Sequence, residues 1–511
     1  MNNTEAPTLL DLLEEIKKLR EDIDRHEKLL DKIVPFYQQP NGSGLPTWSP
    51  VEDSSSPIRQ EVSLKVVRRV ERQNEKSRDI LTRLKATWFG RLYTDHLKKY
   101  TLVRSVSIFV WHNVYPFYVR RLASPFWRNR ADKRWRPLTK LSEFSTREKI
   151  PTFKLADACF VKTPPPEVFP IKEKTYLVSP HESYEFPELY VAQINKGTVY
   201  GGTNLLLAGD EVICHDLYDF ERDFTSEELH GRTFIDPESK RIRWLLHDKD
   251  PEVIPALATF VDACAPNYAH WVTEVLPRIA LFCNDRRFEG VPIVVNEGLH
   301  KNIMASLALV VGTEREIIIL SIGRAIIADT LFVTSVVGYV PFERRNNTFL
   351  EYSHGLFSPR TFTLLNEKIG IPTKDAATKA FPKKIYLRRN SGMRKIFNSQ
   401  EIEKYFQSIG YAIVEPERLS FLEQVMLFSN ADVIVGSSGA ALANLIFAQK
   451  DAKIFIFIPK FKDTSYWYWQ NIACATGKAI TYVFGLRLKD GIHSDFIIDI
   501  NDLSVIFEGD I

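Results

Sequence analysis

The spacing of hydrophobic residues at the start of this 511-residue chain differs from their spacing in the rest of the chain. In residues 1–35 the apolar positions recur in steps of three and four, which is the a/d repeat of a coiled coil. These positions are Leu9, Leu12, Ile16, Leu19, Ile23, His26, Leu30 and Ile33, with Thr8 as the expected N-cap. The segment predicts a homo-oligomerisation helix. Ile at the a positions and Leu at most d positions favour a parallel dimer, but His26 at a d position leaves a trimer or tetramer possible. The alternative is a single helix that packs on its own chain.

After this helix, residues 36–60 are rich in Gly, Pro and Ser and predict a flexible linker. Residues 61–150 predict a basic, aromatic helical segment, helical from about residue 61 to residue 100. The chain has a net charge of +3, but residues 61–140 alone hold 20 Lys and Arg against 6 Asp and Glu. Arginines among tryptophans and tyrosines favour a membrane surface as partner. A helical domain with a solvated charged face is the second interpretation; nucleic acid is not expected, because no binding module for it is recognisable.

The remaining bulk properties favour a cytoplasmic location, peripheral at the inner face of a membrane. The first 30 residues are charged throughout, and no apolar run approaches the roughly 20 residues that span a bilayer. The five cysteines are scattered without a CxxC pair, which disfavours a disulfide framework and a structural zinc site. No pattern predicts any other metal site.

From residue 151 the apolar runs shorten and alternate with helical stretches, which is typical of a parallel α/β layer. We assign residues 151–375 to a first lobe. Its expected strands are 175–179, 189–194, 198–209, 241–247, 254–262, 292–296, 316–320 and 325–337.

Residues 376–490 repeat the alternation as a second lobe, and residues 491–511 form a C-terminal tail. Strands are expected at 384–389, 411–416, 432–436 and 453–459, with helices at 398–410, 420–431 and 438–448. Ser420 and Glu423 have capping-box spacing, Asn398 is an expected N-cap, and Gly410 is expected to end its helix. The fold class is therefore α/β: two Rossmann-like lobes facing a cleft, with ligands at the carboxyl ends of the strands.

The stretch VIVGSSGAALAN predicts an anion site, because a buried strand ends at Gly436 and a helix begins by Gly439. Ser437 and Ser438 add hydroxyl donors. Small residues that serve only helix packing are the alternative. The stretch YLRRNSGMRK adds four cations, Arg388, Arg389, Arg394 and Lys395. Guanidinium groups suit a diphosphate and can stabilise it as a leaving group without a metal, whereas solvated loop charges are the alternative.

A second stretch, NYAHWVTEVLPR, predicts a helix capped by Asn267 with a polar edge. His270, Glu274 and Arg278 share one stripe, and Trp271, Val275 and Ile279 share the stripe that faces the core. Pro277 removes one intrahelical hydrogen bond and bends the helix. A His and a Glu one turn apart can act as base and orienting partner, and a surface ion pair is an equally good interpretation.

In their order along the chain, these stretches and LSFLEQVMLFSNADVIVGSSGAALANLIF resemble glycosyltransferase family 61, over about residues 170–490. The resemblance implies a GT-B architecture, a nucleotide-sugar donor such as a UDP-sugar, and inversion at the anomeric carbon without a metal cofactor. The family's N-x-x-H-x-x-x-(D/E)-x-x-P pattern falls on Asn267, His270, Glu274 and Pro277.

The resemblance also implies a donor site on the second lobe. The family's tyrosine, its two arginines and the following asparagine fall on Tyr386, Arg389, Arg394 and Asn398, and its E-Q pair falls on Glu423 and Gln424. Its glycine-rich element falls on Gly436, Gly439, Ala440, Leu442 and Asn444. The family histidine is Ser438 here, which can donate a hydrogen bond but cannot act as a base or a cation. Ser437, Ala441, Arg388 and Glu415 complete the candidate site.

From the resemblance we expect the diphosphate on residues 436–441 and Glu274, or otherwise His270, as the base that deprotonates an acceptor hydroxyl. The expected acceptor is a glycan or lipid-linked glycan of the cell surface, such as capsule or O-antigen. A non-catalytic glycan-binding or scaffold protein derived from a glycosyltransferase is the alternative, and Ser438 is its main support.

Overall fold

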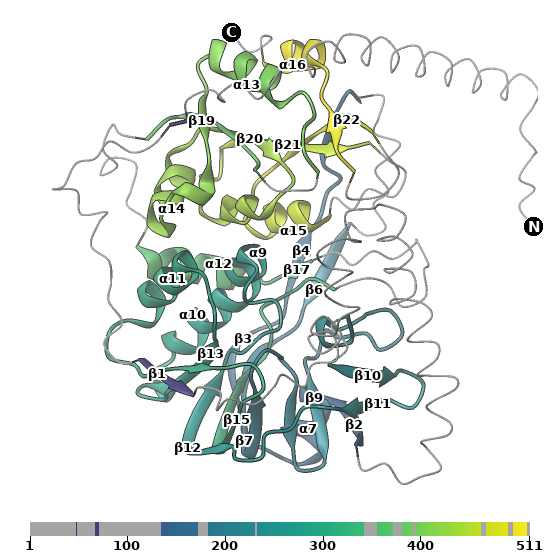
Figure 1. The fold of residues 1–511 in the computed structure, drawn as a ribbon, viewed down its shortest axis with the longest axis vertical. Helices are drawn as coiled ribbons and strands as arrows, with labels where there is room; N and C mark the ends of the chain where they lie inside the picture. Colours follow the sequence, from purple (N-terminus) through teal and green to yellow (C-terminus); the bar gives the residue numbers. More distant parts are fainter. Residues whose placement is uncertain are drawn as a thin grey trace, which may run out of the picture.

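The computed structural model describes residues 47–48, 67–70, 134–171, 182–229, 232–341, 355–370, 381–390, 394–460, 467–488 and 494–507 (Figure 1). The predicted coiled coil lies outside these residues, as do nearly all of the predicted linker and most of the basic segment. Those three predictions therefore stay predictions.

The first sheet is mixed and contains twelve of the described strands. One half is parallel and consists of β1 (Val67–Val70), β14 (Ile317–Leu320), β13 (Ile293–Asn296), β12 (Glu252–Thr259) and β15 (Ala325–Thr334), in that order. The other half follows as β7 (Leu189–Tyr200), β8 (Leu206–Ala208), β9 (Glu211–Cys214), β2 (Trp135–Lys140), β11 (Arg241–Trp244) and β10 (Thr233–Asp236), and β3 (Thr152–Ala156) pairs with β7.

The predicted parallel layer is correct for the first of these halves only. Helices connect β12, β13 and β14, and such crossovers give parallel neighbours. In the other half, β8 and β9 are joined by only Gly209 and Asp210, and a connection this short permits only an antiparallel pair. Gly209 adopts a left-handed φ of 59° in this turn, which glycine allows without steric cost.

Two described pieces of the predicted basic helical segment belong to this sheet, so the helical prediction is wrong for them. Residues 67–70 form the edge strand β1, which pairs with β14, and β2 lies inside the other half, parallel to β9 and antiparallel to β11, before helix α7 (Leu141–Arg147). Val70 is buried, while Arg68 forms ion pairs with Glu252 and Glu316 of the sheet. An edge strand is held by backbone pairing with a distant segment, and local periodicity does not reveal such a partner.

The second sheet is parallel through six strands, of which four were predicted in residues 376–490 and two, β22 and β5, were not. Their order is β19 (Ala412–Val414), β18 (Lys384–Leu387), β20 (Val433–Ser437), β21 (Lys453–Pro459), β22 (Thr481–Arg487) and β5 (Glu167–Phe169), and β23 (Phe496–Ile497) is antiparallel to β22. β5 comes from the part of the chain assigned to the first lobe, so residues 167–169 extend the second sheet. Trp48 adds a single bridge at the opposite edge, next to Val414.

Helices follow the strands of both sheets. The first sheet has α8 (Ser226–Leu229), α9 (Tyr268–His270), η7 (Trp271–Val275), α10 (Leu276–Asn284), η8 (Arg286–Phe288), α11 (Lys301–Val311) and α12 (Pro359–Ile369). The second has α13 (Ser399–Ser408), η9 (Pro416–Arg418), α14 (Phe421–Asn430), η10 (Ala440–Phe447), α15 (Trp467–Ala475) and α16 (Ile500–Phe507). Two small ladders, β4 (Cys159–Lys162) with β6 (Ser183–Phe186) and β16 (Gly338–Tyr339) with β17 (Leu356–Phe357), complete the described elements.

The helix signals in the sequence are largely confirmed. Ser420 and Glu423 form both hydrogen bonds of the capping box of α14, and Gly410 follows α13 with a left-handed φ of 83°. Asn398 precedes α13 but does not cap it, because its amide is hydrogen bonded to the backbone of Ile498 instead. The helix predicted over 438–448 is a 3₁₀ helix, η10.

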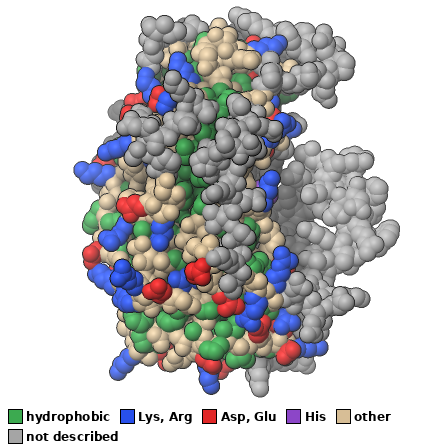
Figure 2. Space-filling view, turned by 90° about the vertical axis from the view of Figure 1, so that its left-hand side faces the viewer, with side chains coloured by type: hydrophobic (Ala, Val, Ile, Leu, Met, Phe, Trp, Pro, Cys, Tyr) green, Lys and Arg blue, Asp and Glu red, His purple; other side chains and the backbone are tan. Residues whose placement is uncertain are grey.

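The helices between the two sheets pack into one layer. In Figure 1, α9 to α12 of the first sheet lie against α14 and α15 of the second. One hydrophobic cluster contains residues of both groups, including Leu276, Phe362, Val425, Leu442 and Ile472. On the side that carries β1 and α11, Lys and Arg side chains lie intermixed with Asp and Glu side chains (Figure 2). In the part of the chain that the structure describes, no helix has the length and apolar character that crossing a membrane requires.

Candidate active site

The helix predicted from NYAHWVTEVLPR is present but changes its winding. Asn267 caps α9 as predicted, with its side-chain oxygen accepting the N–H of Ala269. Residues 271–275 then form the π-helical turn η7, and α10 begins with Pro277 in its first turn. Proline is tolerated there because the first N–H groups of a helix have no intrahelical acceptor. Where a bend was predicted at Pro277, the structure has a π turn directly before the proline, a feature frequent at functional sites.

His270 and Glu274 form the polar edge of this helix. The distance between His270 Nδ1 and Glu274 Oε1 is 2.5 Å, and their side chains are 15% and 14% exposed. The backbone N–H of Val340, directly after β16, also donates to the Glu274 carboxylate. A Cβ at Gly338 would lie 2.7 Å from the carbonyl oxygen of Thr273, so glycine lets β16 approach the π turn this closely. The pair is held from two sides and still reaches the surface.

Burial and charge act against each other at this pair. Burial alone would lower the pKa of His270, but the charge and the hydrogen bond of Glu274 outweigh it and raise the pKa above its ordinary 6.5. Burial raises the pKa of Glu274 above its usual range, although His270 lowers it. The two groups are coupled, so their titration steps belong to the pair and not to either residue alone.

Two further charges lie behind the pair. Arg278 is 7% exposed and its guanidinium lies 3.8 Å from the Asp262 carboxylate, which also acts on both His270 and Glu274. Asp262 follows β12 and is fixed by Asn296, whose side-chain oxygen accepts the Asp262 N–H. Arg278 thus shares the stripe predicted for it but lies under the surface, where it offsets the carboxylates.

A second cluster lies at the carboxyl ends of β18 and β20. Arg389 Nη1 donates to the carbonyl oxygen of Ser438 at 2.7 Å, and Arg394 Nη1 donates to the Ser438 hydroxyl at 3.4 Å. Burial, together with the nearby charge of Arg394, lowers the pKa of Arg389 to about 10. Arg394 has no ion-pair partner among the described residues, and its backbone adopts a left-handed φ of 55°. Strain of this kind at a non-glycine residue is concentrated at ligand sites.

The start of η10 supplies further donors to this cluster. The N–H of Ser438 donates to the carbonyl oxygen of Phe457, and that of Leu442 donates to the carbonyl oxygen of Gly439. Within the described part of the chain, the N–H groups between them, at residues 439–441, are therefore the best placed to bind a ligand. Ala440 is exposed and Ala441 partly so. Ser437 is only 7% exposed, and its hydroxyl has no hydrogen-bond partner among the described residues. Donors outnumber acceptors here, which is the composition of an anion site.

Residues 268–455 match the sequence model of the family Glycosyltransferase 61. The chain carries a glycosyltransferase family 61 domain. The predicted resemblance is thereby confirmed for this part of the chain, and the domain is a glycosyltransferase domain. No curated protein gave a significant match.

Helix α15, which sequence reasoning missed, contacts both clusters. The Tyr468 ring lies over the His270 ring, with centroids 6.5 Å apart, and its hydroxyl is 3.2 Å from that of Thr273. The adjacent Trp469 donates its indole N–H to the Ser438 hydroxyl at 3.0 Å. α15 follows the family match in sequence. The aromatic run at residues 466–469, placed after a strand's carboxyl end, is the signal that could have identified it.

Several predicted donor-binding residues serve the fold of the domain instead. Asn444 is fully buried and joins Tyr268 to Gln424 through its amide, and Tyr386 is buried against Phe406 beneath α13. A Cβ at Gly436 would lie 2.9 Å from Leu387, so this glycine is required by strand packing. These positions orient the elements of the site without lining it.

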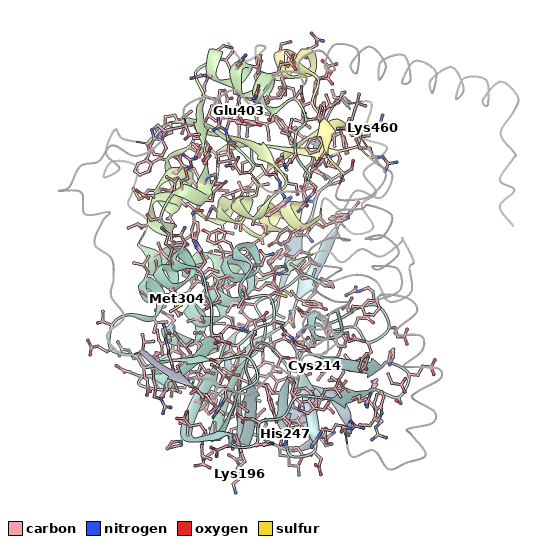
Figure 3. The ribbon with its side chains drawn as sticks, viewed as in Figure 1. Lys196, Cys214, His247, Met304, Glu403 and Lys460 are labelled. Carbon is pink, nitrogen blue, oxygen red and sulfur yellow. The ribbon has the colours of Figure 1, made fainter. Side chains whose placement is uncertain are left out.

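Arg388 is also bound within the fold. Its guanidinium forms two hydrogen bonds with Glu403, of 2.6 and 2.9 Å, and one of 2.8 Å with Glu415. Glu415 pairs in turn with Arg418. Figure 3 places Glu403 on the α13 side of the second sheet, away from the first sheet. Arg388 and Glu415 therefore form a structural ion-pair network rather than part of a diphosphate site.

Proposed function

We propose that the chain is an inverting, metal-independent glycosyltransferase of GT-B architecture. It transfers a sugar from a nucleotide-sugar, a UDP-sugar, to a hydroxyl of a growing cell-surface glycan such as capsule or O-antigen. The observation that supports this most is the juxtaposition, through Tyr468 and Trp469, of the His270–Glu274 pair with the Arg389, Arg394 and Ser438 cluster. One cluster can take up a proton, and the other can receive a diphosphate.

Of His270 and Glu274, His270 is better placed to act as the general base. Its Nδ1 is engaged by Glu274, so the proton of the acceptor hydroxyl goes to Nε2. Glu274, which already receives the Val340 N–H and the imidazole, holds the ring in the tautomer with hydrogen on Nδ1 and stabilises the imidazolium that forms. Glu274 was the preferred base in the sequence analysis, so this assignment reverses that preference.

The transfer then proceeds as a single displacement. The acceptor oxygen, losing its proton to His270, forms a bond to the anomeric carbon while the bond from that carbon to the diphosphate oxygen breaks. The diphosphate leaves with the electron pair of that bond. Arg389, Arg394, the Ser438 hydroxyl and the amides of residues 439–441 are placed to stabilise its charge.

The pH dependence of the rate follows from the His270–Glu274 contact. Neutral His270 is the active form and its pKa is raised, so kcat/KM should rise with pH through a midpoint above 6.5. In Glu274→Gln the stabilising charge is lost and burial dominates, so the midpoint should fall and the maximal rate should drop on the order of 10²-fold. The measurement is kcat/KM against pH for both proteins. An unchanged midpoint in Glu274→Gln would contradict the assignment.

Gly439 offers a test of the diphosphate cluster. A Cβ there would lie 2.0 Å from Arg389 Nη1, so Gly439→Ala should displace Arg389 from the Ser438 carbonyl. Loss of a charge-assisted contact predicts UDP binding weaker by roughly tenfold or more, measured by calorimetry. Arg389→Ala should give the same defect, and the double variant should be no weaker. Additive losses would show that Gly439 acts independently of Arg389.

A panel of nucleotide-sugars tests the function itself. Thermal shift identifies the donor that stabilises the chain, and hydrolysis of that donor, followed by release of UDP, measures turnover. Binding without hydrolysis or transfer would favour the non-catalytic glycan-binding alternative.

The amino-terminal part supports two further proposals from sequence alone. Residues 1–35 oligomerise the enzyme, and the basic segment holds it at the inner face of a membrane, near a lipid-linked glycan acceptor. Replacing Arg120, Arg121, Arg128 and Arg130 by Gln should weaken sedimentation with vesicles that contain anionic lipid. Equal sedimentation of the variant and the native chain would exclude electrostatic docking by these residues.

A further inference from the structure

Four consecutive side chains of α15 are each bound to a different segment of the molecule. Tyr468 contacts Thr273 of η7, and Trp469 donates to Ser438 before η10. Gln470 donates to the carbonyl oxygen of Pro164 at 2.7 Å, and Asn471 donates to that of Gly355 at 2.9 Å. Residues one helical position apart point in different directions, so α15 is fixed around its whole circumference. It cannot rotate or slide without breaking several of these bonds.

The hydrogen-bond directions at Tyr468 are determined. The Thr273 hydroxyl donates its only proton to the carbonyl oxygen of Ala269 at 2.7 Å, so towards Tyr468 it must accept. The Tyr468 hydroxyl is therefore the donor. This bond holds the ring over the imidazole of His270, one turn before Thr273 on the same helix. The Tyr468 ring therefore lies beside a face of the imidazole, while Glu274 contacts its edge at Nδ1.

The directions at Ser438 are determined in the same way. Its hydroxyl oxygen accepts from Trp469 at 3.0 Å and from Arg394 at 3.4 Å, which occupies both acceptor positions. The hydroxyl proton must then point elsewhere, and no acceptor for it lies among the described residues. Trp469, which is 5% exposed, is a rigid donor held by the core. With both acceptor positions filled, the Ser438 hydroxyl is left as a hydrogen-bond donor.

We propose that α15 is the positioning element of the site. Tyr468 fixes the orientation of His270, and Trp469 fixes the Ser438 hydroxyl as a donor to the leaving diphosphate. The inference rests on the proposed transferase function and adds two positioning residues to it. Because both side chains are neighbours on one rigid helix, the base and the diphosphate site keep a constant separation.

Tyr468→Phe tests the first half of the proposal. It keeps the ring and removes the bond to Thr273, so kcat for sugar transfer or donor hydrolysis should fall by about tenfold, since small displacements of a base are costly. The KM for donor and the affinity for UDP should not change. Tyr190→Phe is the matched control, because it removes a buried tyrosine bond to Asp216 on the first sheet and should leave kcat unchanged. Equal kcat in Tyr468→Phe and the native chain would overturn this half.

A double-mutant cycle tests the second half. Trp469→Phe and Ser438→Ala should each weaken UDP binding, on the order of fivefold for one neutral hydrogen bond. The double variant should bind no more weakly than Ser438→Ala alone, because the indole acts only through the hydroxyl. Should Trp469→Phe fail to fold, Ser438→Ala alone still decides whether this hydroxyl contacts the ligand. UDP affinity unchanged in Ser438→Ala would overturn the proposal.

The native chain separates this inference from the proposed function. If it neither binds a nucleotide nor turns over any nucleotide-sugar, the transferase proposal fails and the positioning role falls with it. If it binds UDP and transfers sugar while the α15 variants behave as the native chain does, the function stands and only the positioning role is wrong.

Discussion

His270→Ala should lower turnover of the nucleotide-sugar by about 10²–10⁴-fold, the range usual for a lost general base. The affinity for UDP should stay within about twofold, because the proposed diphosphate site is built from residues of the second sheet and its following loops. The physical reason is the engaged Nδ1: Glu274 holds the imidazole so that Nε2 accepts the proton, and alanine removes that nitrogen. Single-turnover kinetics with saturating donor give the chemical step directly.

His247→Ala is the control for this experiment. His247 is exposed, and Figure 3 places it at the end of the first sheet that lies away from the second. Its loss should leave turnover unchanged. Exogenous imidazole should partly restore the rate of His270→Ala, since a small base can enter the vacated space. Near-native turnover in His270→Ala would exclude His270 as the base and return the role to Glu274.

Local signals in the sequence were sufficient for the second sheet. The capping box of Ser420 and Glu423 and the buried strand before Gly436 are set by residues within a few positions of one another, and both are present. Short helices between short apolar strands leave few alternatives to parallel pairing. The strands β18 to β21, the helices between them and their parallel pairing could therefore be predicted.

The pairing of strands that lie far apart in the sequence could not be predicted from such local signals. β1 and β5 are short segments whose only sheet partners lie far along the chain, in β14 and β22. Their own composition carries no period, because edge pairing uses backbone groups that every residue has. The helical prediction for residues 67–70 failed for this reason.

The candidate site shows the same division between local and distant information. His270 and Glu274 are four residues apart, so their contact could be predicted from helical spacing. Arg388 and Arg389 are adjacent residues of the same type with different partners. Arg388 pairs with Glu403 and Glu415, whereas Arg389 donates to the Ser438 carbonyl oxygen. Both residues follow the end of β18, and the partners that each side chain meets there are decided by tertiary structure.

Arg388→Ala should lower the free energy of unfolding by about 3–5 kcal/mol, the cost of removing one partner from a buried ion pair. The Glu403 and Glu415 side chains are only 6% and 5% exposed, so two carboxylates would be left in a site of low polarity. Urea denaturation followed by tryptophan fluorescence measures the loss as a lower midpoint with an unchanged slope. Arg147→Ala is the matched control, because Arg147 also bridges two carboxylates but is 48% exposed, and solvent screens such pairs. If Arg388→Ala unfolds at the native midpoint, the network contributes nothing to the second sheet, and Arg388 again becomes a candidate ligand for the diphosphate.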